Sequence, residues 1–237
     1  MLINAARRVN AAIRTRRRRL ANRRVARRLA TTPGYVFTAD YISRRTAVWQ
    51  QHLAQFAGKA HVRLLEVGSF EGRSAIWFLE NVLTHPTASM TCVDPFVWQG
   101  REPRFDHNIE VSGLADKVTK IKARSEEILG TLEEHSFDIA YIDGSHLAPN
   151  VMLDAMLTWM LLKPGGILLF DDYCWQPDRP LHERPKMAID AFLKVLETQL
   201  EILHVGYQVI VKKSAHNREP SRQPMPEAPN PEAPAQP

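Results

Sequence analysis

The feature of this sequence that most constrains its fold is the alternation of short apolar segments with segments of helical periodicity. Buried parallel strands have near-continuous apolar composition, whereas amphipathic helices repeat their apolar residues every three to four positions. An order of strand, helix, strand predicts a mostly parallel, doubly wound α/β sheet with helices on both faces. The expected strands are 62–67, 89–94, 118–123, 137–143 and 166–172, and the expected helices between them are 73–84, 105–114, 125–132 and 148–162.

The last part of this alternation predicts a different pairing. Residues 187–200 have helical periodicity, and residues 201–213 form two β-type runs on either side of Gly206. Two strands separated by a short turn pair as an antiparallel hairpin. The prediction is therefore a seven-stranded sheet that ends in an antiparallel hairpin.

The composition limits the class of protein. At 237 residues and 44% hydrophobic, the chain can form one α/β domain with extensions. The two cysteines, Cys92 and Cys174, lie in apolar segments and cannot build a disulfide framework, so a reducing compartment is expected. No apolar run approaches the roughly 20 residues that span a bilayer, and we expect a cytoplasmic protein.

The two ends of the chain differ from its centre. Residues 1–30 contain eleven arginines and no acid, with apolar residues spaced as on one helix face. This leader could bind an anionic membrane surface or nucleic acid, or be a solvated helix or an organellar transit peptide. Residues 31–60 are expected to be a helical lead-in, 61–213 the main domain, and 214–237 a disordered Pro-rich tail.

Polar residues and glycines follow four of the expected strands. They include the loop 66–72, Asp94, the segment 143–146 and the pair Asp171-Asp172. In open parallel sheets, ligands bind outside the carboxyl ends of the strands. The sequence therefore predicts one ligand site built from these strand ends.

The loop after the first expected strand is suited to approach a ligand closely. Gly68 and Gly72 allow a tight turn, and the helix that follows offers unpaired backbone N–H groups. Its spacing matches neither a phosphate-binding Walker loop nor the G-x-G-x-x-G pattern of nicotinamide enzymes. Asp94 is placed to accept hydrogen bonds from ribose hydroxyls, so these residues predict a nucleoside-containing cofactor.

Four motifs in order resemble those of one enzyme family. The segments "EVGSFEGRS", "CVDPF", "FDIAYIDGSH" and "LLKPGGILLFDDY" resemble the class I S-adenosylmethionine-dependent methyltransferases, which have a Rossmann-like fold. Among them, the chain is most similar to the branch that contains the catechol and macrolide-sugar O-methyltransferases. The resemblance covers about residues 60–213 and neither extension. Phe70 replaces the middle glycine of the usual motif, as is common in that branch.

The resemblance implies S-adenosylmethionine as the cofactor and assigns residues to it. It places one group around the methionine part, with Ser69 in the same loop as a further cofactor residue. Asp94 would hold the ribose, and Ser125 would lie near the adenine. The methionine group is Glu66, Gly68, Gly72 and Ser74.

Three aspartates at neighbouring strand ends predict a metal. Repulsion among Asp143, Asp171 and Asp172 should raise the pKa of at least one of them unless a cation or another partner intervenes. Carboxylate oxygens suit Mg²⁺ or a similar divalent cation. In the resembled enzymes, aspartates at the matching positions hold the metal, so these three residues are the expected ligands.

The mechanism implied is O-methylation of a small hydroxylated acceptor. A metal-bound hydroxyl would lose its proton to His146, the candidate general base, with Asp143 beside it as the second catalytic residue. His146 matches the proposed base of the sugar-modifying relatives, whereas catechol enzymes have a lysine there. Acceptor specificity is expected from residues 31–60, 96–105 and 175–185.

Two alternative functions remain at this stage. The arginine-rich leader would suit a methyltransferase acting on RNA or another macromolecule, although the rest of the chain has a net negative charge. A cofactor-binding module without catalysis is the other, although it would be expected to lack the residues assigned to catalysis. The sequence predicts neither the acceptor's identity nor the oligomeric state.

Overall fold

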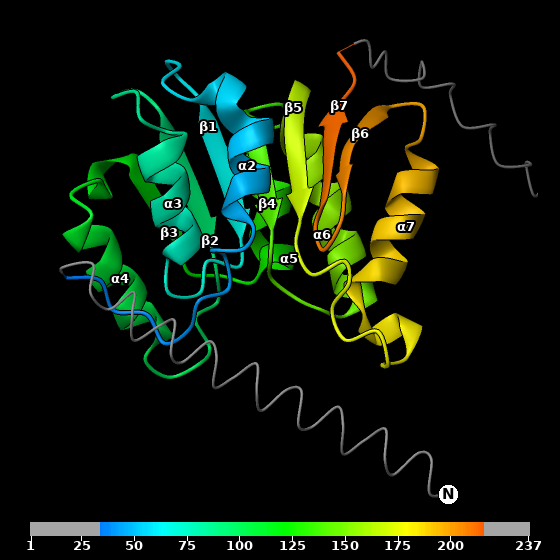
Figure 1. Cartoon of the computed structure of the whole chain (residues 1–237), viewed down its shortest axis with the longest axis horizontal. Helices are drawn as coiled ribbons and strands as arrows, with labels where there is room; N and C mark the ends of the chain where they lie inside the picture. Colours follow the sequence, from blue (N-terminus) through cyan, green and yellow to red (C-terminus); the bar gives the residue numbers. More distant parts are fainter. Residues whose placement is uncertain (1–33, 216–237) are drawn as a thin grey trace, which may run out of the picture.

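The computed structural model describes residues 34–215, which form a seven-stranded sheet between two layers of helices (Figure 1). The strand order is β3-β2-β1-β4-β5-β7-β6, and β7 runs in the opposite direction to the other strands. This arrangement confirms the predicted fold class, including the C-terminal hairpin. The strands are β1 (Arg63–Val67), β2 (Ser89–Val93), β3 (Val118–Ile121), β4 (Phe137–Ile142), β5 (Leu162–Phe170), β6 (Leu200–Val205) and β7 (Val209–Lys213).

Helix α2 precedes the first strand, and the other helices of this part of the chain lie between the strands. Two of them begin with a proline in their first turn, where its missing N–H group has no helical partner to lose. The helices are α2 (Thr46–Leu53), α3 (Arg73–Asn81), α4 (Arg101–Val111), α5 (Ser125–Ile128), α6 (Ala148–Leu161) and α7 (Pro185–Val195).

The sheet is buried on both faces, which explains why its parallel strands read as uninterrupted apolar runs. Leu64 points into the core beneath α2, α3 and α4, whereas Leu65 points into the core beneath α6 and α7. In the first core, the Trp49 ring stacks on Phe78 with centroids 4.7 Å apart. The two cores hold the strand ends in fixed positions relative to each other.

Two elements, α4 and β5, start four residues earlier than predicted. Helix α4 begins at Arg101 rather than at residue 105, with Gly100 in a left-handed conformation before it. The prediction missed this start because the charged first turn lacks an apolar pattern. Part of the expected acceptor loop 96–105 is therefore helical. Strand β5 begins at Leu162, and the Pro-Gly-Gly turn expected to precede it lies within the strand as an irregularity in its pairing with β4.

The lead-in contains α2 and, before it, a segment without regular structure. Residues 35–45, here called the roof segment, contribute Tyr41 and Arg45 to the wall of the cavity described below. The predicted leader 1–30 and most of the predicted tail lie outside the described residues. Within residues 34–215, no helix combines the length and apolar character needed to span a bilayer.

Candidate functional site

The strand ends surround one cavity of about 680 Å³, which matches the predicted position of the site. Gly68 and Phe70 follow β1, Asp94 follows β2, and Asp143 and His146 follow β4. Sites for small molecules and cofactors commonly have volumes of about 300–1,000 Å³. The cavity can therefore hold a nucleoside cofactor together with a small second ligand.

Gly68 brings the β1 loop against the end of β4. Its φ of +91° is a conformation that side chains disfavour, and a Cβ atom there would lie 2.3 Å from the carbonyl oxygen of Asp143. The Gly68 N–H donates to the Val93 carbonyl at 2.8 Å. Only glycine fits this junction of three strand ends, and its backbone is open to a ligand in the cavity.

Asp94 holds the loops that flank it. Its carboxylate accepts hydrogen bonds from the backbone N–H groups of Phe70 at 2.9 Å and Phe96 at 2.6 Å. Both phenylalanines have positive φ angles, of 51° and 48°. Non-glycine residues in this region carry strain and cluster at functional sites. Asp94 also lines the cavity, where lone pairs of its oxygens can accept from a ligand.

Four of the predicted cofactor residues lie behind the cavity wall. Glu66, Ser69 and Ser74 are buried, and the Ser74 hydroxyl donates to the Glu66 carboxylate at 2.5 Å. Burial raises the pKa of Glu66 to about 7. Gly72 starts α3 in a left-handed conformation and faces the Phe105 ring. These residues shape the loop from below, and their direct contact with a cofactor stays a prediction.

Ser125 is brought to the same cavity as Gly68 and Asp94. It is the first residue of α5, after β3, on the outer side of the sheet from β1. The sequence assigned these three residues to one ligand although they lie on different loops. In the structure, all three residues line the same cavity, so one ligand could reach all of them.

The three aspartates, here called the acidic cluster (Asp143, Asp171 and Asp172), meet at the ends of β4 and β5. The Tyr141 hydroxyl lies 3.0 Å from a carboxylate oxygen of Asp143 and 2.7 Å from one of Asp171. One phenolic hydrogen can serve only one of them at a time. Enclosure by protein raises the pKa of Asp143 well above its ordinary value, and repulsion from Asp171 and Asp172 raises it further. The predicted repulsion is therefore confirmed.

Asp171 has a cationic partner that the sequence did not reveal. The Arg45 Nε atom donates to the two oxygens of Asp171 at 2.9 and 3.2 Å, and Arg45 Nη2 lies 3.9 Å from Asp172. Burial and the nearby Asp172 raise the pKa of Asp171, and Arg45 opposes that rise. A guanidinium group is thus part of the acidic cluster's surroundings.

His146 is held by the third aspartate. Its Nε2 atom lies 2.5 Å from a carboxylate oxygen of Asp172, and its ring contacts Trp175 at a centroid distance of 4.3 Å. Burial alone would raise the pKa of Asp172, but hydrogen bonds from His146 and Tyr207 outweigh it and lower the pKa. Asp172 has a φ of 57°, a strained conformation that aims its side chain at the histidine.

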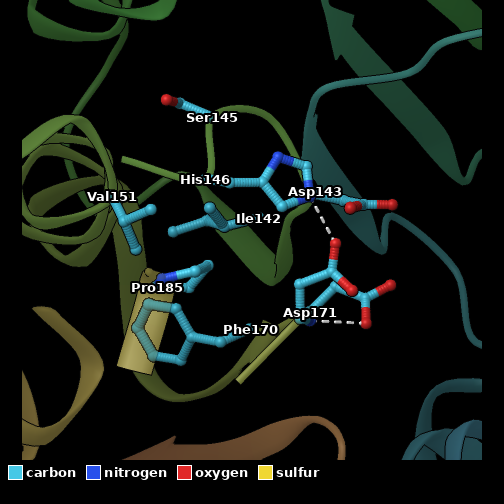
Figure 2. A pocket seen from close by; sticks show the side chains of 9 residues that line it. Ile142, Asp143, Ser145, His146, Val151, Phe170, Asp171 and Pro185 are labelled. Carbon is cyan, nitrogen blue, oxygen red and sulfur yellow. Dashed lines mark hydrogen bonds and ion pairs between the residues drawn. The ribbon is translucent and has the colours of Figure 1, made fainter. Parts of the chain in front are cut away.

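A second, much smaller pocket of about 10 Å³ lies beside the imidazole (Figure 2). Val151, Phe170 and Pro185 line its apolar side, and the ring of His146 projects above it toward Asp143. The pocket has room for about one water molecule. The imidazole thus lies between this small pocket and the large cavity, which His146 also lines.

The acidic cluster does not fit the predicted Mg²⁺ site in this arrangement. Within residues 34–215, no group of three or more His, Cys, Asp or Glu side chains is arranged to hold a metal ion. The Asp171 carboxylate pairs with Arg45, and the Asp172 carboxylate pairs with His146. Asp143 has no cationic partner among the described residues. The donor set expected from the sequence is therefore divided among protein partners.

Polar contacts hold the roof segment against the glycine loop, and the fully buried Glu71 makes two of them. The fully buried Glu71 accepts hydrogen bonds from the Thr38 backbone at 2.6 Å and the Thr38 hydroxyl at 2.7 Å, and pairs with Arg104. Asp40 pairs with Arg73 at 3.0 Å. These contacts hold the segment that carries Tyr41, a cavity-lining residue whose ring packs edge-on against Phe70.

Some of the residues that complete the site had a local signal. Tyr141 precedes Asp143 by two positions in β4, so the period of a strand places both side chains on one face. Arg45 and Glu71 had no such signal, because their partners are distant in the chain or belong to the irregular roof segment. Trp77 is partly buried against the core, and Trp175 lines the cavity.

Comparison with known proteins finds a family match in the central part of the chain. Residues 65–173 match the family model described as a methyltransferase domain. The match spans the glycine loop, Asp94 and the acidic cluster, and it confirms the resemblance to class I S-adenosylmethionine-dependent methyltransferases. A curated relative, the uncharacterized protein R132 of Acanthamoeba polyphaga mimivirus, is 29% identical over 136 residues, or 54% of this chain. The aligned region spans 60% of that relative's length.

Solved structures share the fold at low identity. The O-methyltransferase TomG from Streptomyces achromogenes, involved in tomaymycin synthesis and in complex with SAM, is 17% identical with a TM-score of 0.58. That alignment covers 83% of this chain and 89% of TomG. The O-methyltransferase from Bacillus cereus, in complex with SAH, is 15% identical with a TM-score of 0.58, covering 81% of this chain and 88% of that one. At these identities the likeness establishes the fold.

Proposed function

We propose that this chain transfers the methyl group of S-adenosylmethionine to a hydroxyl of a small acceptor, such as a sugar, another diol or a catechol. The observation that carries this proposal is the His146–Asp172 pair, which lies on the wall of the same cavity as Gly68 and Asp94. The match of residues 65–173 to a methyltransferase domain supports the choice of cofactor.

The proposed cofactor residues divide into those that face the cofactor and those that hold its loop. Gly68, Asp94 and Ser125 line the cavity, where Gly68 would offer its backbone, Asp94 would accept from the ribose hydroxyls and Ser125 would lie near the adenine. Glu66 and Ser74 keep the loop in place from behind. When bound, the cofactor supplies a methyl group on a sulfonium, which an acceptor oxygen takes as the sulfur–carbon bond breaks.

His146 would receive the acceptor's proton. The hydrogen bond from Nε2 to Asp172 leaves the Nδ1 atom of the neutral ring free to accept a proton. The carboxylate then stabilises the imidazolium and holds its orientation, as in other His–Asp pairs. A positioned general base of this kind contributes about 10²–10⁴-fold to a rate.

A small acceptor suits the enclosure of the site. The roof segment covers one side of the cavity, and Trp175 stands against His146 on the other. Residues 34–215 also contain more acidic than basic side chains, which disfavours a nucleic acid at this surface. A macromolecular acceptor remains the rival, and its test belongs in the same assay.

The decisive assay measures transfer of a labelled methyl group into catechols, sugars with neighbouring hydroxyls, and total RNA. Label in a small hydroxylated acceptor supports the proposal, whereas label in RNA alone refutes it in favour of the macromolecular alternative. Binding of S-adenosylhomocysteine without transfer to any acceptor in a broad panel would favour a binding module.

His146→Gln separates catalysis from cofactor binding. We expect transfer to fall by about 10²–10⁴-fold, because the general base is lost. Binding of S-adenosylhomocysteine, measured by calorimetry, should be retained because His146 is not among the proposed cofactor residues. His61, an exposed histidine before β1 and outside the cavity, provides the control His61→Gln. Full activity of His146→Gln would remove the histidine from the mechanism.

A further inference from the structure

We infer that Arg45 takes the place of a divalent cation in the acidic cluster, so that the proposed methyl transfer requires no metal. The claim that methyl transfer needs no metal rests on the proposed function. The claim that Arg45 replaces a cation does not, because it depends only on the contacts of Arg45 with Asp171 and Asp172. The Arg45 and Asp171 side chains are 13% and 4% exposed, so the pair is largely removed from solvent.

The oxygen atoms that would bind a metal already have protein donors. One Asp171 oxygen accepts from Arg45 Nε at 2.9 Å and from the Asp172 backbone N–H at 2.7 Å. The other accepts from the Tyr141 hydroxyl at 2.7 Å, and Arg45 Nε lies 3.2 Å away. Mg²⁺ binding would have to break these contacts, because a metal needs the same lone pairs.

Asp143 alone offers little to a metal beside this guanidinium. Asp143 and Asp171 share the Tyr141 hydroxyl, so a cation on Asp143 would lie close to the Arg45–Asp171 pair. Like charges at such a separation repel each other. The positive charge of Arg45 therefore opposes binding of a divalent ion at Asp143, the member of the acidic cluster that has no cationic partner among the described residues.

The position of Arg45 is set by the fold. The residue directly precedes α2, and its carbonyl accepts hydrogen bonds from the backbone N–H groups of Val48 and Trp49 at 3.0 and 3.1 Å. Trp49 is fully buried and its indole donates to Gln208 at 2.8 Å. The guanidinium also stacks over the Tyr207 ring, 4.1 Å from its centroid. A core helix and an aromatic face therefore deliver the cation to the acidic cluster.

Arg45 acts as a positioning residue in this scheme. By neutralising Asp171 and approaching Asp172, it lets three carboxylates stand together without a metal. Asp172 then remains available to orient His146 at 2.5 Å. Deprotonation of the acceptor falls to the histidine, and no Lewis acid is needed to lower the hydroxyl's pKa.

The test is direct Mn²⁺ binding to the full-length chain, measured by electron paramagnetic resonance with the metal alone as the probe. We expect no specific Mn²⁺ site in the unaltered protein or in Arg45→Lys, which keeps the charge. Arg45→Gln should gain one site, and adding Asp143→Asn should remove it. Circular dichroism checks that each variant is folded.

Several outcomes would overturn the inference. One Mn²⁺ bound stoichiometrically by the unaltered protein and lost in Asp171→Asn would show that the carboxylates form a metal site despite Arg45. A folded Arg45→Gln variant that gains no site would show that the guanidinium is not what excludes the metal. If Arg45→Gln does not fold, the unaltered protein and Arg45→Lys still decide the question.

Methyl transfer with and without EDTA separates this inference from the proposed function. Transfer that is unchanged by EDTA supports a metal-free site. Transfer that is lost with EDTA and restored by Mg²⁺ would overturn the role of Arg45 while leaving O-methylation intact. Absence of transfer to every acceptor would refute the proposed function, and the Mn²⁺ measurement would still stand.

Discussion

Glu66 provides a test of the loop's support that needs neither cofactor nor acceptor. Its carboxyl group is fully buried beneath the glycine loop and accepts a hydrogen bond from the Ser74 hydroxyl. Burial raises its pKa from an ordinary 4.5 to about 7. Glu66→Gln retains the size of the side chain and an oxygen that can accept from Ser74, but it removes the titratable proton.

The direction of the effect follows from proton linkage. The native state holds the Glu66 proton more tightly than the unfolded chain, so the stabilisation is complete below pH 4.5 and is lost as the pH rises through about 7. Each pKa unit corresponds to about 1.4 kcal/mol, so the loss is about 3 kcal/mol. Glu66→Gln lacks this loss, and its stability relative to the unaltered protein should rise by that amount.

Urea unfolding followed by tryptophan fluorescence measures this difference between about pH 5 and about pH 8. Other titrating groups occur in both proteins and cancel in the comparison. Glu110→Gln, which removes an exposed carboxylate from α4, is the matched control. A stability difference for Glu66→Gln that does not change with pH would refute the assignment of a buried, readily protonated carboxyl group.

Three other substitutions test the loop and its roof. Gly68→Ala should lower the thermal unfolding temperature strongly, because its Cβ would meet a carbonyl oxygen at 2.3 Å, whereas Gly113→Ala, with positive φ but open space around it, should cost only about 1 kcal/mol. Glu71→Gln should speed hydrogen exchange and proteolysis of the roof segment by leaving Thr38 and Arg104 imperfectly paired with this fully buried side chain. Unchanged protection would mean that other contacts hold the roof. Asp94→Ala should weaken S-adenosylhomocysteine binding in calorimetry, and unaltered affinity would remove it from the cofactor site.

The position of the site could be predicted because it depends on strand order and strand ends. Apolar runs located β1, β2, β4 and β5 to within a few residues, and parallel strands bring their carboxyl ends to one edge of the sheet. Gly68, Asp94 and His146 therefore meet at one cavity, as expected from their places after these strands. The same reasoning could not say which loop residues face the ligand, because backbone turns decide this. Glu66, a β1 residue assigned to the cofactor, is fully buried and accepts a hydrogen bond from Ser74, so its contact with a cofactor stays a prediction.

The partner of the acidic cluster could not be predicted from the sequence, and the reason is physical. Three neighbouring carboxylates require compensating positive charge, but a divalent metal and a guanidinium both satisfy that requirement. Arg45 lies 126 residues before Asp171, and no local periodicity connects them. Its contact depends on where α2 packs against the sheet through Trp49, which is a property of the whole fold. Because the sequence specifies the need for a cation but leaves its source open, the choice between metal and arginine has to be read from packing and tested by metal binding.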